Sequence, residues 1–157
     1  MRIEELAFVC QEAARDLATS GQRPLPPSVV LPTPKATRIV RLEEFPDDDD
    51  ERRALLTQFA HDEMTHANAP AFGFIAEADG EGQDVVVVVY GATNNHPRIT
   101  GAAIREAGAL GDFGESEPLD PGALPFLAPL VHAVSHATAP PPTSADVLSE
   151  LQRDLPT

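Results

Sequence analysis

The sequence Val85-Val86-Val87-Val88-Val89-Tyr90 decides the fold, because it joins five β-branched residues to an aromatic one. β-branched side chains favour extended backbone, and a run without polar alternation predicts a strand covered on both faces. Residues 71–78 alternate as a strand does, and residues 79–83 between the two segments have the composition of a hairpin turn. The centre of the chain therefore predicts an antiparallel hairpin within a sheet.

Further strands are expected on both sides of this hairpin. Residues 37–42 alternate well enough to form one. Residues 98–106 fit either period: we favour a strand paired with the valine run, then a turn at Gly108 and a short return, and a helix is the alternative. Residues 22–36 carry five prolines, whose missing N–H donors predict an extended surface segment with at most a short edge strand.

Helical spacing of apolar residues marks four other segments. Residues 3–17 have one apolar stripe, as an amphipathic helix does. Residues 50–68 follow a run of aspartates whose charges complement the free N–H groups at a helix start, and the run lacks the pattern of a calcium loop. Residues 121–137 and 144–155 complete the set, the last with Ser144 as a candidate N-cap.

These elements predict an α+β protein with a small, mainly antiparallel sheet of three to four strands. Flanking helices come from both termini and from residues 50–68. A length of 157 residues is typical of one domain, so residues 1–157 are expected to share one core. Residues 22–36 form its extended proline-rich segment, and residues 138–157 carry a loosely attached C-terminal helix.

The charge balance is the most unusual total, because 25 acidic residues stand against 11 basic ones, for a formal net charge of −14. Such a field repels phosphate backbones and anionic membrane surfaces, so direct binding of nucleic acid or membrane is not expected. It favours a basic protein partner, or mimicry of a nucleic acid if the carboxylates form two spaced rows. Solubility alone is the simplest explanation of the charge.

The cellular location and the single cysteine follow from simple patterns. The start of the chain lacks the basic and then apolar pattern of a signal peptide, and no apolar run approaches the roughly 18 residues of a membrane span. A cytoplasmic protein is therefore expected.

Cys10 has no second cysteine to pair with, and its surroundings predict a buried hydrophobic role and not a reactive thiol.

His132 and His136 form a candidate metal site. They are four residues apart on a predicted helix, so they share one face, opposite the leucine–valine stripe, and are expected to be exposed. Such a pair can chelate Zn²⁺ or Ni²⁺ if a third ligand joins it. The candidates for that ligand are His61, His66, His96 or a carboxylate. An ordinary solvated helix face is the simpler alternative.

The segment from His61 to His66 has a weaker metal-like pattern. Its two histidines are five apart, which is a poor match to one helical face. Glu63 and His66 form one Glu-x-x-His pair of the kind that di-iron bundles use, but those bundles need a second pair, and the sequence has none. We therefore expect an exposed rim near a helix end.

A polar cluster follows the valine strand and provides a candidate ligand-binding site. Its residues are Tyr90, Asn94, Asn95, His96 and Arg98. Polar residues that a rigid strand positions often bind ligands. The Asn-Asn-x-Pro sequence is also common turn chemistry, so a purely structural turn is the alternative.

The sequence contains no recognisable catalytic motif. It has neither a glycine-rich phosphate loop nor a Gly-x-Ser-x-Gly elbow, and no motif is specific enough to name a family. We expect a non-enzymatic, acidic binding or interaction protein. A metal-binding protein or metal-dependent enzyme that uses His132 and His136 is the alternative, and a nucleic-acid mimic is the third option.

Overall fold

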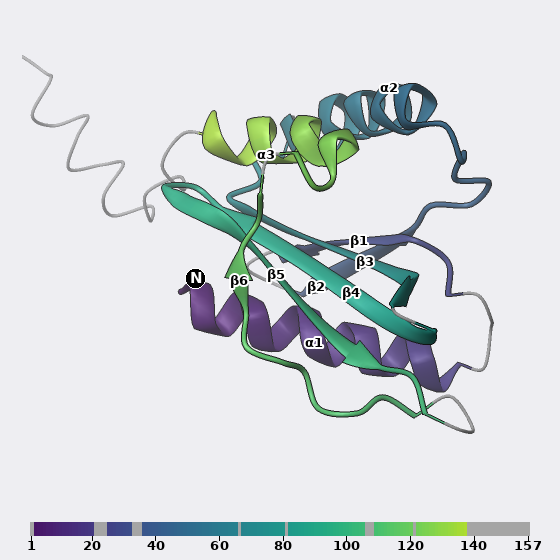
Figure 1. Cartoon of the computed structure of the whole chain (residues 1–157). Helices are drawn as coiled ribbons and strands as arrows, with labels where there is room; N and C mark the ends of the chain where they lie inside the picture. The colour runs from purple at the N-terminus through teal and green to yellow at the C-terminus, as the bar shows by residue number, and fades with distance from the viewer. Residues whose placement is uncertain are drawn as a thin grey trace, which may run out of the picture.

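A computed structural model of the chain describes residues 2–20, 25–32, 36–65, 67–80, 82–105, 109–120 and 122–137 (Figure 1). The elements are α1 (Ile3–Thr19), β1 (Ser28–Pro32), β2 (Thr37–Arg41), α2 (Asp49–Phe59), η1 (Ala60–Thr65), β3 (Ala71–Gly80), β4 (Gln83–Ala92), β5 (Asn95–Ala103), β6 (Glu117–Pro118), η3 (Pro125–Leu127) and α3 (Ala128–Ser135). Six strands form an antiparallel sheet in the order β2-β1-β3-β4-β5-β6. Helix α1 covers one face, and α2 and α3 cover the other (Figure 1). The α+β class is confirmed, but the sheet is larger than the three to four strands expected.

The valine strand β4 lies inside the sheet and contributes to both cores. Val86, Val88 and Tyr90 belong to the hydrophobic cluster under α1. Val87 and Val89 point the other way and pack in the cluster under α2 and α3. Because successive strand residues face opposite sides, this run supplies both cores with apolar side chains, as its lack of alternation predicts.

Strand β1 corrects the prediction for the proline-rich segment. It lies between β2 and β3, and all five of its residues are buried. This part of the proline-rich segment is therefore neither a surface segment nor an edge strand. Pro27 precedes the strand and Pro32 ends it, so the four residues from Ser28 to Leu31 keep their N–H donors. The prolines therefore bound a short inner strand, and β2 takes the edge position.

Helix α1 packs closely on β3 at one glycine. A Cβ atom placed on Gly73 would overlap the Sγ atom of Cys10. Helix α1 can therefore approach the sheet this closely because residue 73 has no side chain. Cys10 is buried, as predicted. Burial raises the pKa of its thiol to about 12, which removes thiolate reactivity at neutral pH.

Helix α2 begins where the aspartate run predicts. The Asp48 carboxylate accepts a hydrogen bond from the Glu51 N–H at 3.0 Å, as a helix N-cap does. The helix continues as a π-helical segment, η1, which ends at Thr65. The predicted helix over residues 121–137 is confirmed in shorter form, because η3 and then α3 begin only at Pro125 and Ala128.

The remaining predictions have mixed outcomes. Strand β5 confirms the strand interpretation over residues 98–103, and the predicted return after it is one bridge between Ile104 and Leu110. The predicted turn at Gly108 lies outside the described residues. The predicted helix over residues 144–155 lies outside the described residues. Among the helices that the structure describes, none is long and apolar enough to cross a membrane.

Candidate functional site

A cleft of about 700 Å³ lies between α3, the turn joining β4 to β5, and the chain just after β6. We call it the α3 cleft. Its larger apolar lining residues are Pro97, Leu119, Leu124, Leu127 and Val131, and its polar lining residues are Asn94, Asn95, His96, His132, Ser135 and His136. The cleft therefore brings together three residues of the predicted ligand-binding cluster and both residues of the predicted metal site.

Three hydrogen bonds hold the walls of the α3 cleft in place. The Thr93 hydroxyl in the β4–β5 turn donates to the Val134 carbonyl of α3 at 2.7 Å. The Leu119 N–H donates to the Pro97 carbonyl at 2.8 Å, and His96 Nε2 lies 3.0 Å from the Leu119 carbonyl. Since a carbonyl only accepts, His96 Nε2 carries the proton, and its Nδ1 is left as an acceptor in the neutral ring.

A β-bulge determines which way His96 points. Tyr90 pairs with Arg98, and Ala92 pairs with Asn95, so Gly91 alone on β4 stands against two residues on β5. An extra residue on one strand reverses the alternation of side chains beyond it. His96 therefore lines the α3 cleft although it is two residues from Arg98, which lines a cavity beside α1.

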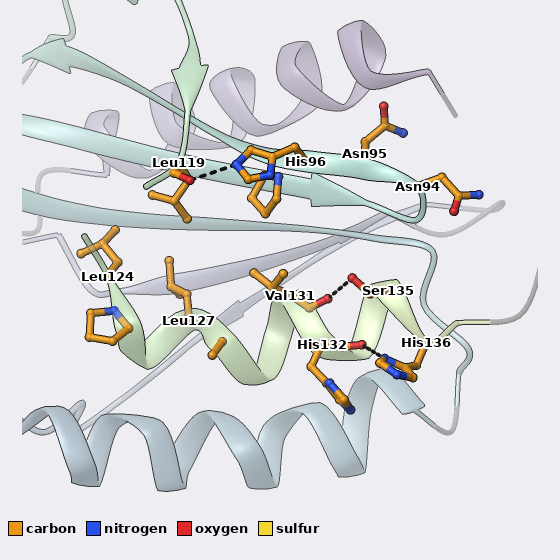
Figure 2. A pocket seen from close by; sticks show the side chains of 13 residues that line it. Asn94, Asn95, His96, Leu119, Leu124, Leu127, Val131, His132, Ser135 and His136 are labelled. Atoms are coloured by element: carbon orange, nitrogen blue, oxygen red, sulfur yellow. Dashed lines mark hydrogen bonds between the residues drawn. The ribbon is translucent and has the colours of Figure 1, made fainter. Parts of the chain in front are cut away.

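The floor of the α3 cleft is apolar and only partly covered. Leu119 and Leu127 are buried, whereas Leu124 and Val131 are half-buried. Figure 2 shows Leu127 and Val131 pointing from the helix toward the strands, with His96 and Leu119 on the opposite wall. The sequence predicts Leu124, Leu127 and Val131 on an apolar helix face. Helical spacing does not distinguish the residues of that face that fill the core from those that line the cleft.

The predicted metal pair lies at the rim of the cleft. His132 and His136 are both exposed, as predicted, and their ring centroids are 3.9 Å apart with an interplanar angle of 30°. His136 Nδ1 donates to the His132 carbonyl at 3.0 Å (Figure 2). Because His136 Nδ1 is engaged by this carbonyl, the His136 ring would bind a metal through its Nε2 atom.

The proposed third metal ligands are not assembled around this pair. Across the described parts of the chain, no group of three or more His, Cys, Asp or Glu side chains is arranged to hold a metal ion. His61 is exposed and lines, with His132, a separate cavity of about 380 Å³ between α2 and α3. Glu63 accepts a hydrogen bond from Arg38 at 3.1 Å, and His66 lies outside the described residues.

The other two residues of the predicted ligand-binding cluster lie on the opposite side of the sheet. Tyr90 and Arg98 line a cavity of about 490 Å³ between α1 and β5, together with Phe8 of α1 and Ser116. The structure thus divides the polar cluster into two groups with different neighbours. Nothing in the sequence pointed to Phe8 or Ser116 as lining residues.

The Ser135 hydroxyl and two of the imidazoles of the α3 cleft bond to backbone carbonyls. The Ser135 hydroxyl donates to the Val131 carbonyl at 2.8 Å, so no imidazole accepts its proton. His96 and His136 likewise bond to backbone carbonyls.

Comparisons with known protein families, with curated proteins and with solved structures give no match.

Proposed function

We propose that the protein is a non-enzymatic binding protein whose α3 cleft receives an amphipathic, positively charged segment of a partner protein. The observation that carries this proposal is an apolar cleft whose described lining includes no Asp, Glu, Lys or Arg, in a chain of net charge −14. Clefts of about 300–1,000 Å³ with apolar walls and few polar groups are usual ligand sites. An amphipathic helix commonly binds by laying its apolar side chains into such a groove.

The apolar part of the proposal rests on α3 and the turn before it. Leu124 and Val131 are half-buried, whereas Leu130 and Val134 on the core side of the same helix are fully buried. The half-buried pair therefore presents apolar surface to an occupant of the cleft. Burying that surface favours binding by about 25 cal/mol for each Å² removed from water.

The charged part rests on the edge of the cleft near β6. Glu117 and Asp120 are exposed on either side of Leu119, which lines the cleft. Arg53 lines the separate cavity between α2 and α3, and Arg98 lies on the far side of the sheet. Lysine or arginine residues flanking the apolar stripe of a partner would meet carboxylates at this edge, and added salt would weaken that attraction.

Two synthetic peptides test the proposal with the full chain. One is an amphipathic peptide of leucine and lysine with leucines at helical spacing, and the other has the same composition in scrambled order. By fluorescence anisotropy, we expect the amphipathic peptide to bind at least about tenfold more tightly, because only it presents an apolar stripe. Its affinity should also fall as salt is raised. Equal binding of both peptides, or binding unchanged by salt, contradicts the proposal.

Matched variants locate the binding. Val131→Glu places a carboxylate in the cleft and should weaken peptide binding by about a hundredfold, since the bound peptide would bury this charge against its leucine side chains. Phe8→Glu makes a similar change on α1, on the other side of the sheet, and should leave binding unchanged. Leu124→Glu repeats the test at a second lining position if Val131→Glu lowers the melting temperature. Wild-type affinity in both cleft variants rules out the α3 cleft.

A further inference from the structure

The cavity between α1 and β5 holds two polar side chains that face each other across neighbouring strands. Tyr90 of β4 and Arg98 of β5 are direct cross-strand partners. Side chains in that relation lie on one face with their Cβ atoms about 5 Å apart. Both line the cavity of about 490 Å³, and α1 forms its other wall. This site lies across the sheet from the α3 cleft and is independent of the function proposed for it.

Arg98 is positioned, but its charge is not balanced by an acidic partner. Its Nε donates to the Ser116 hydroxyl at 2.9 Å, and its Nη2 donates to the Ser116 carbonyl at 2.7 Å. A guanidinium has five N–H donors, so the group still has donors to offer. Within the described segments, no ion pair includes Arg98. A fixed, half-buried cation with unused donors is suited to a carboxylate, which it can bind in bidentate fashion.

Tyr90 supplies a second unused polar group. Its side chain is only 3% exposed, yet its hydroxyl makes no hydrogen bond to any described residue. Tyr90 lines the cavity, so a ligand there would lie next to this residue. A buried tyrosine hydroxyl usually finds a partner, and a ligand in the cavity would provide one.

The α1 wall of the cavity suits an apolar group. Phe8 is 64% exposed, the most exposed large apolar side chain among the described residues, and Ile3 and Ala7 line the same cavity. We infer that Tyr90 and Arg98 bind the carboxylate of a small organic acid whose aromatic or branched apolar body lies against Phe8. A singly charged acid is favoured over a phosphate, because Arg98 is the one Lys or Arg among the described lining residues and Glu4 also lines the cavity.

Glu4 provides a separate test of the carboxylate site, since it lines the cavity with Arg98 but does not form an ion pair with it. Its carboxylate repels an anionic ligand and also competes with the ligand for the guanidinium. Removing that charge by Glu4→Gln should therefore tighten the binding of an organic acid. A purely structural role for Arg98, which only holds the chain at Ser116, predicts no such gain.

The test is a titration of the full chain with 3-phenylpropionate, followed by isothermal calorimetry or amide chemical shifts. Its neutral amide and phenyl phosphate serve as matched ligands. We expect saturable binding of the carboxylate, at least about tenfold weaker binding of the amide, and weaker binding of the phosphate. No saturable binding of 3-phenylpropionate, equal binding of the amide, or preference for phenyl phosphate would overturn the inference.

Variants then assign the binding to the two side chains. Tyr90→Phe removes only a hydroxyl that bonds to none of the described residues, so the fold should persist while carboxylate affinity falls by about tenfold. Arg98→Gln should abolish carboxylate binding, Glu4→Gln should raise the affinity a few-fold, and Ile39→Glu on the edge strand β2, outside both cavities, should leave it unchanged. Because Arg98→Gln also removes the bonds to Ser116, Tyr90→Phe decides the matter: full carboxylate affinity in that variant rejects the site.

Discussion

The two cavities on either side of the β4–β5 hairpin differ in chemistry although residues close together on that hairpin line both. The α3 cleft has an apolar floor and neutral polar residues at its rim. The cavity beside α1 contains a cation, an acid and a tyrosine hydroxyl next to an exposed phenylalanine. His96 and Arg98, two residues apart, lie in different cavities because a bulge interrupts the strand pairing. A polar cluster in the sequence is therefore not a single site.

The two sides also differ in how their helices meet the sheet. Helix α1 lies directly on β3, where Gly73 admits the Sγ atom of Cys10. Helix α3 meets the β4–β5 turn through the hydrogen bond from Thr93 to Val134 and leaves a cleft beside it. Both helices bury apolar side chains against the sheet, but α3 also leaves a cleft beside it, at the end where Thr93 bonds to the helix. Three substitutions test this difference, from the largest expected effect on the unfolding free energy to the smallest.

Gly73→Ala should have the largest effect on stability. The added Cβ would overlap Cys10 Sγ, so α1 must move away, at a cost of about 3 kcal/mol in unfolding free energy. Urea unfolding measures this cost. The double variant Gly73→Ala/Cys10→Ala should recover most of it, because the overlapping atom is gone. If the second substitution adds to the loss, the close approach of α1 is not what Gly73 provides.

Cys10 should make stability depend on alkaline pH. Burial raises its pKa from 9.0 to about 12, so the unfolded chain loses the thiol proton first. The stabilisation is fully present below pH 9 and is lost as the pH rises toward 12. Relative to Cys10→Ala, the unfolding free energy should fall by about 1.4 kcal/mol per pH unit in that range. A constant difference between the two proteins at pH 8, 9 and 10 contradicts the burial of the thiol.

Thr93→Val should have a smaller effect that is confined to the α3 side. The change keeps the shape of the side chain but removes the hydrogen bond to Val134, which is worth about 1 kcal/mol. Thermal unfolding measures the loss of stability, and the affinity for the amphipathic peptide should fall a few-fold as the cleft loosens. The affinity for 3-phenylpropionate should not change. An equal loss of both affinities would mean that the two cavities are coupled.

Much of the fold could be predicted from the sequence, because its strongest signals are local. The valine run predicted a strand buried on both faces, and the aspartate run predicted the start of α2. The prediction for strand β1 is wrong because the proline content of the whole segment does not show that Pro27 and Pro32 lie only at the two ends of the strand. Strand β6 has two residues, one of them Pro118, so its pairing with β5 has no periodicity to detect.

The candidate sites were less predictable, because they depend on contacts between distant segments. Asn94, Asn95 and His96 meet α3 only through packing between residues about 40 positions apart, such as Thr93 and Val134. The bulge that separates His96 from Arg98 has no sequence pattern of its own. The exposure of His132 and His136 did follow from helical spacing.

The most direct test of the central claim, that the hairpin separates two independent binding sites, is an amide chemical-shift map of the labelled full chain with each probe. The amphipathic peptide should shift amides of α3 and of the residues around Leu119. 3-Phenylpropionate should shift amides of α1 around Phe8 and of Tyr90 and Arg98. The account predicts two separate sets, with each probe binding equally well when the other is saturating. Perturbation of one shared set, or competition between the probes, would contradict it.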